Sequence, residues 1–280
     1  STAGANETKW DVSEAGDGSI LAWYEIVNSN GAVKVHIGSN GKIYANPDSS
    51  YLFSWIASNN NNHNSICTAT EVITNIGLLD TTKVTNMEGM FRETGWSSMI
   101  KLDLGDNFDT SNVTSMKGMF RGTGYSSMQI LRVGSKFNTT KVIDMSNMFD
   151  CTGYSVMQSL DLENNFDTSN VIDMHLMFKS TGKVSMIKLD LGSRFFTSNV
   201  KNMSNMFYEC GQNSMLMLNL GSAFLQIPSN NQNMFALCGK QGYGKIYVPI
   251  SIYKDGNHIR LSDTSDMTVE VPNMTALPIH

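Results

Sequence analysis

Charged residues are scarce in this 280-residue chain. Aspartate, glutamate, lysine and arginine together make up 16% of it, which is low for a cytosolic protein. The 25 acidic residues outnumber the 20 basic ones, and the net charge is −5. Because nucleic-acid-binding proteins are usually basic, this balance argues against a nucleic-acid partner.

Long apolar runs are also missing. No run approaches the roughly 18–20 residues that span a bilayer, so we expect no insertion into a membrane. The first residues, Ser1–Ala5, are small and polar and do not resemble a signal peptide, which is consistent with a mature or trimmed form. The hydrophobic content of 41% nevertheless predicts a real core rather than wholesale disorder.

Motifs for catalysis and metal binding are absent from the sequence. The four cysteines form no Cys-x-x-Cys pair, so we expect no zinc site. No Gly-x-Ser-x-Gly, His-Glu-x-x-His or phosphate-binding glycine loop occurs. We therefore predict that the protein is not an enzyme and has no catalytic residues, no metal site and no cofactor.

Methionine, by contrast, is abundant, and its 19 residues reveal an internal repeat. Met-Phe pairs begin at positions 90, 119, 148, 177, 206 and 234, with spacings of 29, 29, 29, 29 and 28. Further columns keep this period and begin at Val84, Met87, Leu102, Leu104 and Phe108. A fixed period of this length is typical of a stacked repeat array. Because the methionines follow the period of the core, we favour a packing role over a methionine-rich ligand groove.

Each repeat is expected to contain one helix and one strand. In the second copy, Ser111 is a candidate N-cap, and apolar residues then recur at helical spacing from Val113 to Phe120. Leu131 and Val133 alternate with Arg132, which predicts a short strand. The sequence therefore predicts an α/β fold. It is a right-handed, leucine-rich-repeat-like solenoid of 29-residue strand–helix repeats with β caps.

Three regions of one continuous unit are expected. Residues 1–50 form an N-terminal β-meander cap with strands over 20–27, 32–37 and 42–45. Residues 51–240 form the solenoid repeats, with an exposed polar loop at 59–64. Residues 241–280 form a C-terminal β cap.

A column of aromatic residues is the best candidate for binding. It follows the glycine that ends each predicted helix and consists of Trp96, Tyr125 and Tyr154, continued by Lys183 and Gln212. We expect the three rings to form an accessible ladder with Arg92 and Arg121 nearby, since these residue types are enriched at binding hot spots. The alternative is that the rings fold back and cover the junction between helix and strand.

Other polar positions have plainer interpretations. Asp161 and Asp190 could form a carboxylate pair for glycoside hydrolysis, but a spacing of about 4.8 Å along a parallel ladder favours a solvated face. Cys210 and Cys238 share one column, where two buried free thiols are favoured over a disulfide. His175 is expected to be a solvated residue on the polar side of its helix.

The repeats also resemble a known family. Residues 108–120, FDTSNVTSMKGMF, and 166–178, FDTSNVIDMHLMF, resemble the repeats of BspA-like leucine-rich-repeat surface proteins. They are similar as well to a domain of unknown function first noted in mycoplasma lipoproteins, and the resemblance spans about residues 10–250. Two features depart from the family. The repeat is longer, and threonine replaces the usual cysteine at Thr94, Thr123, Thr152 and Thr181.

The resemblance implies a bacterial protein that is secreted or held at the cell surface. It implies an extracellular recognition or adhesion module that binds a host or bacterial surface protein or a glycan. Two alternatives stay open: a receptor-binding component of a phage tail or bacteriocin particle, and a glycan hydrolase built on a solenoid. The ligand and the oligomeric state are left open by the residues.

Overall fold

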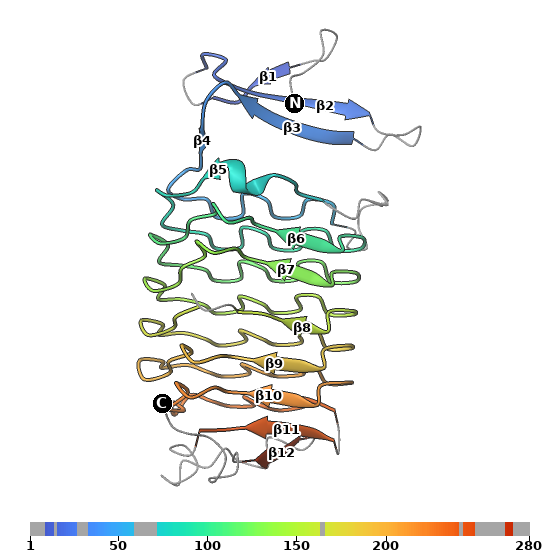
Figure 1. The fold of residues 1–280 in the computed structure, drawn as a ribbon, viewed down its shortest axis with the longest axis vertical. Coiled ribbons are helices and arrows are strands. Elements are labelled where there is room, and N and C mark those ends of the chain that lie inside the picture. The colour runs from blue at the N-terminus through green and yellow to red at the C-terminus, as the bar shows by residue number, and fades with distance from the viewer. Residues whose placement is uncertain are drawn as a thin grey trace.

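The computed structural model describes residues 9–13, 16–26, 33–58, 72–162, 166–240, 243–249 and 267–270. It is an elongated stack of coils with a small antiparallel sheet at the N-terminal end (Figure 1). The first strands are β1 (Lys9–Asp11), β2 (Ile20–Ile26), β3 (Val33–Ser39), β4 (Ile43–Tyr44) and β5 (Leu79–Asp80). The coils continue with β6 (Lys101–Asp103), β7 (Ile130–Arg132), β8 (Ser159–Leu160), β9 (Lys188–Asp190), β10 (Met217–Asn219), β11 (Gly244–Tyr247) and β12 (Met267–Glu270).

Strands of successive coils pair in parallel, one repeat apart. β6 pairs with β7 so that Leu102 lies opposite Leu131, which confirms that these residues share one sheet. β8, β9, β10, β11 and β12 form a second parallel sheet, in which Leu160 lies opposite Leu189 and Leu189 opposite Leu218. The predicted Val, Met, Met-Phe, Leu and Phe columns are all buried, with exposed fractions of at most 8%. The methionines of these columns therefore belong to the core, as favoured over a ligand groove.

The predicted strand–helix repeat is wrong. Among the described residues the one helical element is a 3-10 turn, η1 (Ile76–Leu78), and none is a helix that could span a membrane. Where a helix was predicted, Gly118, Gly122 and Gly124 have positive φ values of 58°, 66° and 55°. An α-helix cannot pass through such residues, because they have left-handed backbone conformations. The fold is accordingly a β-solenoid, not an α/β leucine-rich-repeat structure.

Overlapping turns take the place of the helix. The N–H of Met119 donates to the carbonyl of Met116, three residues earlier in the same coil. The N–H of the next residue, Phe120, instead donates to the carbonyl of Met148 in the following coil, at 2.9 Å. Backbone N–H groups of the turn segment thus donate alternately to carbonyls of the same coil and of the next coil. The bonds between coils hold the stack together.

Stacked phenylalanines fill the interior beside the turns. Phe91, Phe120, Phe149, Phe178 and Phe207 stack in order, with ring centroids 5.4–5.6 Å apart and planes within 9° of parallel. All five are essentially inaccessible to solvent. One coil alone could not bury both faces of such a ring, so the core exists only in the stack.

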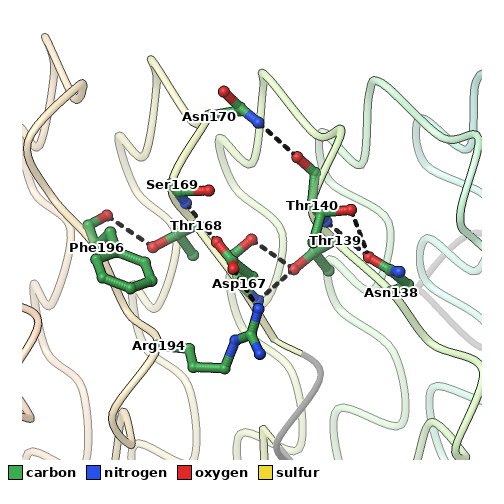
Figure 2. Close-up of polar contacts among 9 residues, drawn as sticks. All are labelled: Asn138, Thr139, Thr140, Asp167, Thr168, Ser169, Asn170, Arg194 and Phe196. Carbon is green, nitrogen blue, oxygen red and sulfur yellow. Dashed lines mark hydrogen bonds and ion pairs between the residues drawn. The ribbon is translucent and has the colours of Figure 1, made fainter.

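Buried threonines link the coils a second time. The hydroxyl of Thr139 donates to the carbonyl of Asp167 and accepts from the N–H of the same residue, both at 2.7 Å (Figure 2). Thr110 and Thr81 make the same double contact one and two coils earlier, respectively. The Asp167 carboxylate then pairs with Arg194 Nη2 at 2.6 Å. A side chain thus supplies lateral bonds where the strands do not pair.

The two ends differ from the expected caps in detail. β1, β2 and β3 form an antiparallel sheet in the predicted N-terminal cap. β4, expected as the third strand of that meander, instead pairs in parallel with β5 and so belongs to the first coil. β11 and β12 extend the parallel sheet at the C-terminal end. The loop predicted at 59–64 and most of 241–280 lie outside the described residues.

Candidate functional site

The predicted aromatic column forms a continuous stack on successive coils. The rings of Trp96 and Tyr125 lie 4.2 Å apart with planes 3° from parallel, and those of Tyr125 and Tyr154 lie 4.3 Å apart at 11°. All three side chains are half-buried. Each follows a glycine with positive φ, so the chain turns outward directly before the ring. The ladder is therefore present, and it is partly accessible.

The backbone under the stack explains its regular spacing. The N–H of Ser126 donates to the carbonyl of Trp96 at 2.8 Å, and the N–H of Ser155 donates to the carbonyl of Tyr125 at 3.0 Å. Gly122 leaves room for the Trp96 ring, because a Cβ at 122 would lie only 3.2 Å from Trp96 Cζ3. Since neighbouring rings cover each other's faces, the ring edges and the tyrosine hydroxyls are what this column offers to a partner.

A cation extends the column beyond Tyr154. Lys183 Nζ lies 5.7 Å from the centre of the Tyr154 ring and 2.9 Å from Glu209 Oε2. Partial burial works to lower the pKa of Lys183, but Glu209 outweighs it and raises this pKa, so the ammonium stays charged. Burial and the neighbouring Tyr154 raise the pKa of Tyr125, so its hydroxyl stays protonated and able to donate.

The two predicted arginines lie on the preceding turns, and each has a partner. Arg121 Nε is 3.1 Å from Asp150 Oδ2, and the arginine side chain is 43% exposed. Burial raises the pKa of Asp150, and the opposing charge of Arg121 is not enough to cancel this rise. Arg92 Nε is 3.5 Å from Glu93 Oε1, and its guanidinium lies 5.9 Å from the centre of the Trp55 ring. Arg92 thus points to an aromatic residue that the sequence analysis did not single out.

The two carboxylates considered for hydrolysis differ in their surroundings. Asp190 lies 3.1 Å from Lys188 Nζ and accepts hydrogen bonds from Asn219 and from the N–H of Gly192. Although burial opposes the change, these contacts lower the pKa of Asp190. A glycosidase needs a carboxyl group with a raised pKa as its general acid, so Asp190 does not suit that role. Asp161 is exposed to solvent, as predicted.

The remaining candidates are structural. Cys210 and Cys238 are both buried and are not joined in a disulfide, which agrees with the favoured interpretation. His175 is half-buried, and its Nδ1 lies 2.8 Å from Asp173 Oδ1, so, contrary to the prediction, this residue is not freely solvated. Within the described ranges, no group of three or more His, Cys, Asp or Glu residues could hold a metal ion.

Comparison with known proteins gives one match. The family model described as "Mycoplasma protein of unknown function, DUF285" matches residues 60–154 and 124–241, which together cover more than half of the chain. No curated protein and no solved structure matches.

Proposed function

Because the chain belongs to the DUF285 family, whose description assigns no activity, we propose its function from geometry: a non-enzymatic recognition module that binds a macromolecular partner. The binding surface is the edge that carries Trp96, Tyr125 and Tyr154. One observation carries this proposal. These three rings stack on the outside of the coils, while separate phenylalanine stacks already fill the interior. Partly exposed aromatic rings in a row are more than the core requires.

The chemistry of the edge favours a protein partner. A sugar ring stacks on an open aromatic face, but the faces within this column are covered by neighbouring rings. Ring edges, tyrosine hydroxyls and the ammonium of Lys183 suit a protein surface, where tyrosine, tryptophan and charged groups often carry the binding energy. Arg121, 43% exposed, adds a donor on the preceding turn.

A location outside the cell follows from the resemblance of the repeats to BspA-like surface proteins. On this proposal the chain is secreted or held at the surface of a bacterium and contacts a surface protein of a host or of another bacterium. The low charged fraction of 16% supports the same assignment.

The test is a binding screen of the intact chain against host and bacterial surface proteins, followed by two variants. Replacing Trp96, Tyr125 and Tyr154 together with alanine should weaken binding at least about tenfold. The melting temperature should fall only modestly, because each lost ring pair contributes about 0.5–1.5 kcal/mol. The double variant Tyr125→Phe/Tyr154→Phe keeps the stack and removes the hydroxyls. It should retain the melting temperature and lose part of the affinity. A large loss of stability with unchanged binding would assign the column to packing.

A further inference from the structure

The first coil carries two exposed aromatic residues in strained backbone positions. Tyr51 has a φ of 57° and Trp55 a φ of 66°, values that bulky residues rarely adopt. The N–H of Tyr51 donates to the carbonyl of Glu88, as the N–H of Gly89 does to Lys117 one coil later, so Tyr51 and Gly89 are equivalent. At the Tyr51 position the next coils carry Gly89, Gly118, Asn147, Leu176 and Asn205. At the Trp55 position they carry Glu93, Gly122, Cys151, Ser180 and Glu209.

Tyr51 packs against the next coil. Any side chain on Gly89 would overlap its ring, so the ring rests on the Gly89 backbone. Its hydroxyl donates to Glu88 Oε1 at 2.9 Å, which fixes the orientation of the ring. The residue is nonetheless 43% exposed, so part of it is accessible to a ligand.

Trp55 provides a second exposed ring four residues further along. It is 45% exposed, and its ring has the Arg92 guanidinium 5.9 Å from its centre. Within the part of the chain that the structure describes, no other aromatic ring stacks on Tyr51 or Trp55. In this they differ from Trp96 and Tyr125, whose rings cover each other's facing sides.

The position of the first coil explains the exposure of its residues, but not the aromatic character of Tyr51 and Trp55. Leu52 and Ile56 are 48% and 39% exposed, and they occupy the columns of Met90 and Thr94, which later coils bury. Their exposure follows from lying at the end of the stack. In later coils the positions of Tyr51 and Trp55 are buried or half-buried and carry no aromatic ring, so packing does not require an aromatic residue there.

The charges around the two rings are paired. Glu88 Oε1 lies 3.6 Å from Lys117 Nζ, and Arg92 pairs with Glu93. Beyond Gly89, a Cβ added at Gly118 would have only Arg121 Cβ within 4 Å, so the next coil leaves space for a side chain there. The rings are therefore bordered by hydrogen-bond donors and acceptors with little net charge.

We propose that Tyr51 and Trp55 form a binding site for a neutral oligosaccharide. The apolar face of a hexose would pack on the exposed parts of the two rings, and its hydroxyl groups would bond to Arg92, Glu88 and Lys117. An anionic glycan gains less here, because each of these cations already has a carboxylate partner. The site is separate from the Trp96 column and does not depend on the function proposed for that column.

The experiment is calorimetric titration of the full chain with neutral hexasaccharides of glucose, mannose and N-acetylglucosamine, with a heparin hexasaccharide as the charged comparison. Two variants introduce the residues found at the equivalent positions of later coils. They are Tyr51→Asn, matching Asn147, and Trp55→Gly, matching Gly122. Each should weaken binding of the neutral sugar at least about tenfold. The melting temperature should stay unchanged or rise, because asparagine and glycine tolerate the left-handed backbone.

A matched control separates this site from the edge proposed above. The double variant Tyr125→Phe/Tyr154→Phe should bind the neutral sugar as the unmodified chain does. Three results would overturn the proposal: no neutral hexasaccharide binds; heparin binds more tightly and in a salt-dependent way; or both variants lower the melting temperature and leave sugar binding unchanged. None of them bears on protein binding at the Trp96 column.

Discussion

Replacing Thr139 with valine should destabilise the solenoid much more than the same replacement at Thr123. Both threonines are fully buried, and valine has nearly the same shape, so the change removes a hydroxyl and little else. The Thr139 hydroxyl bonds to both the N–H and the carbonyl of Asp167, each at 2.7 Å. The Thr123 hydroxyl makes one bond, at 2.7 Å, to the carbonyl of Phe91, which also accepts from the N–H of Thr94.

The expected magnitudes follow from the groups left without partners. Thr139→Val leaves a buried N–H and a buried carbonyl unpaired, at about 1–3 kcal/mol each, so the free energy of unfolding should fall by about 2–6 kcal/mol. Thr123→Val leaves a carbonyl that still has one partner, and about 0.5–1.5 kcal/mol should be lost.

Two measurements check this prediction. Urea denaturation compares the two variants, and hydrogen exchange of the segment that contains Asp167 reports the local effect, which is needed because long repeat arrays can unfold in steps. The Asp167 amide should lose protection in Thr139→Val and keep it in Thr123→Val. Equal losses of stability, or unchanged protection of that amide, would refute the view that these hydroxyls replace lateral backbone bonds.

Three further predictions concern single positions. Gly221→Ala should destabilise the fold more than Gly192→Ala in urea denaturation: both glycines have a φ of 73°, but only a methyl group at 221 would overlap the carbonyl oxygen of Gly192. Equal losses would mean that backbone strain alone decides the effect. Burial raises the pKa of the Cys151 and Cys210 thiols to about 12, so a thiol reagent at about pH 8 should label neither residue until the protein unfolds. Peptide mass spectrometry would locate the label, and labelling of either cysteine in the folded chain would contradict this prediction. Burial works to raise the pKa of Asp103, but hydrogen bonds from neighbouring cations lower it from 3.8 to about 2. The charged carboxylate therefore stabilises the fold at pH values above 3.8, and this contribution is lost as the pH falls from 3.8 to about 2. Asp103→Asn should therefore flatten the acid side of the stability–pH curve, and an unchanged curve would count against the assignment.

The repeat could be predicted from the sequence because it depends on side chains alone. A 29-residue period placed Leu102 beside Leu131 and buried the Met and Phe columns, and the structure confirms both. The helix could not be distinguished, since overlapping turns also bring every third or fourth residue to one side of the chain. A signal was nevertheless present: Gly118, Asn147 and Asn205 share one position, and glycine and asparagine are the residues that best tolerate a left-handed backbone.

The candidate site was predicted in part. The column of Trp96, Tyr125 and Tyr154 follows from the period, but the 4.2 Å stacking that covers the ring faces depends on the lateral spacing of the coils, which the sequence does not state. Trp55 was missed because the first coil is a degenerate copy. Aligning Leu52–Phe53 with the Met90–Phe91 pair places Tyr51 and Trp55 at the positions of Gly89 and Glu93, where the backbone is left-handed.

The two proposed sites differ in chemistry although they share one backbone, and the construction of the stack explains why. Inward columns cannot vary, because each ring or methionine must fit its equivalents above and below: Phe91, Phe120 and Phe149 are identical. Lateral backbone bonds repeat in every coil whatever the outward side chain is, so a substitution there costs little packing. Recognition in such a solenoid should therefore be encoded coil by coil in the columns outside the apolar interior, where the side chain can change from one coil to the next.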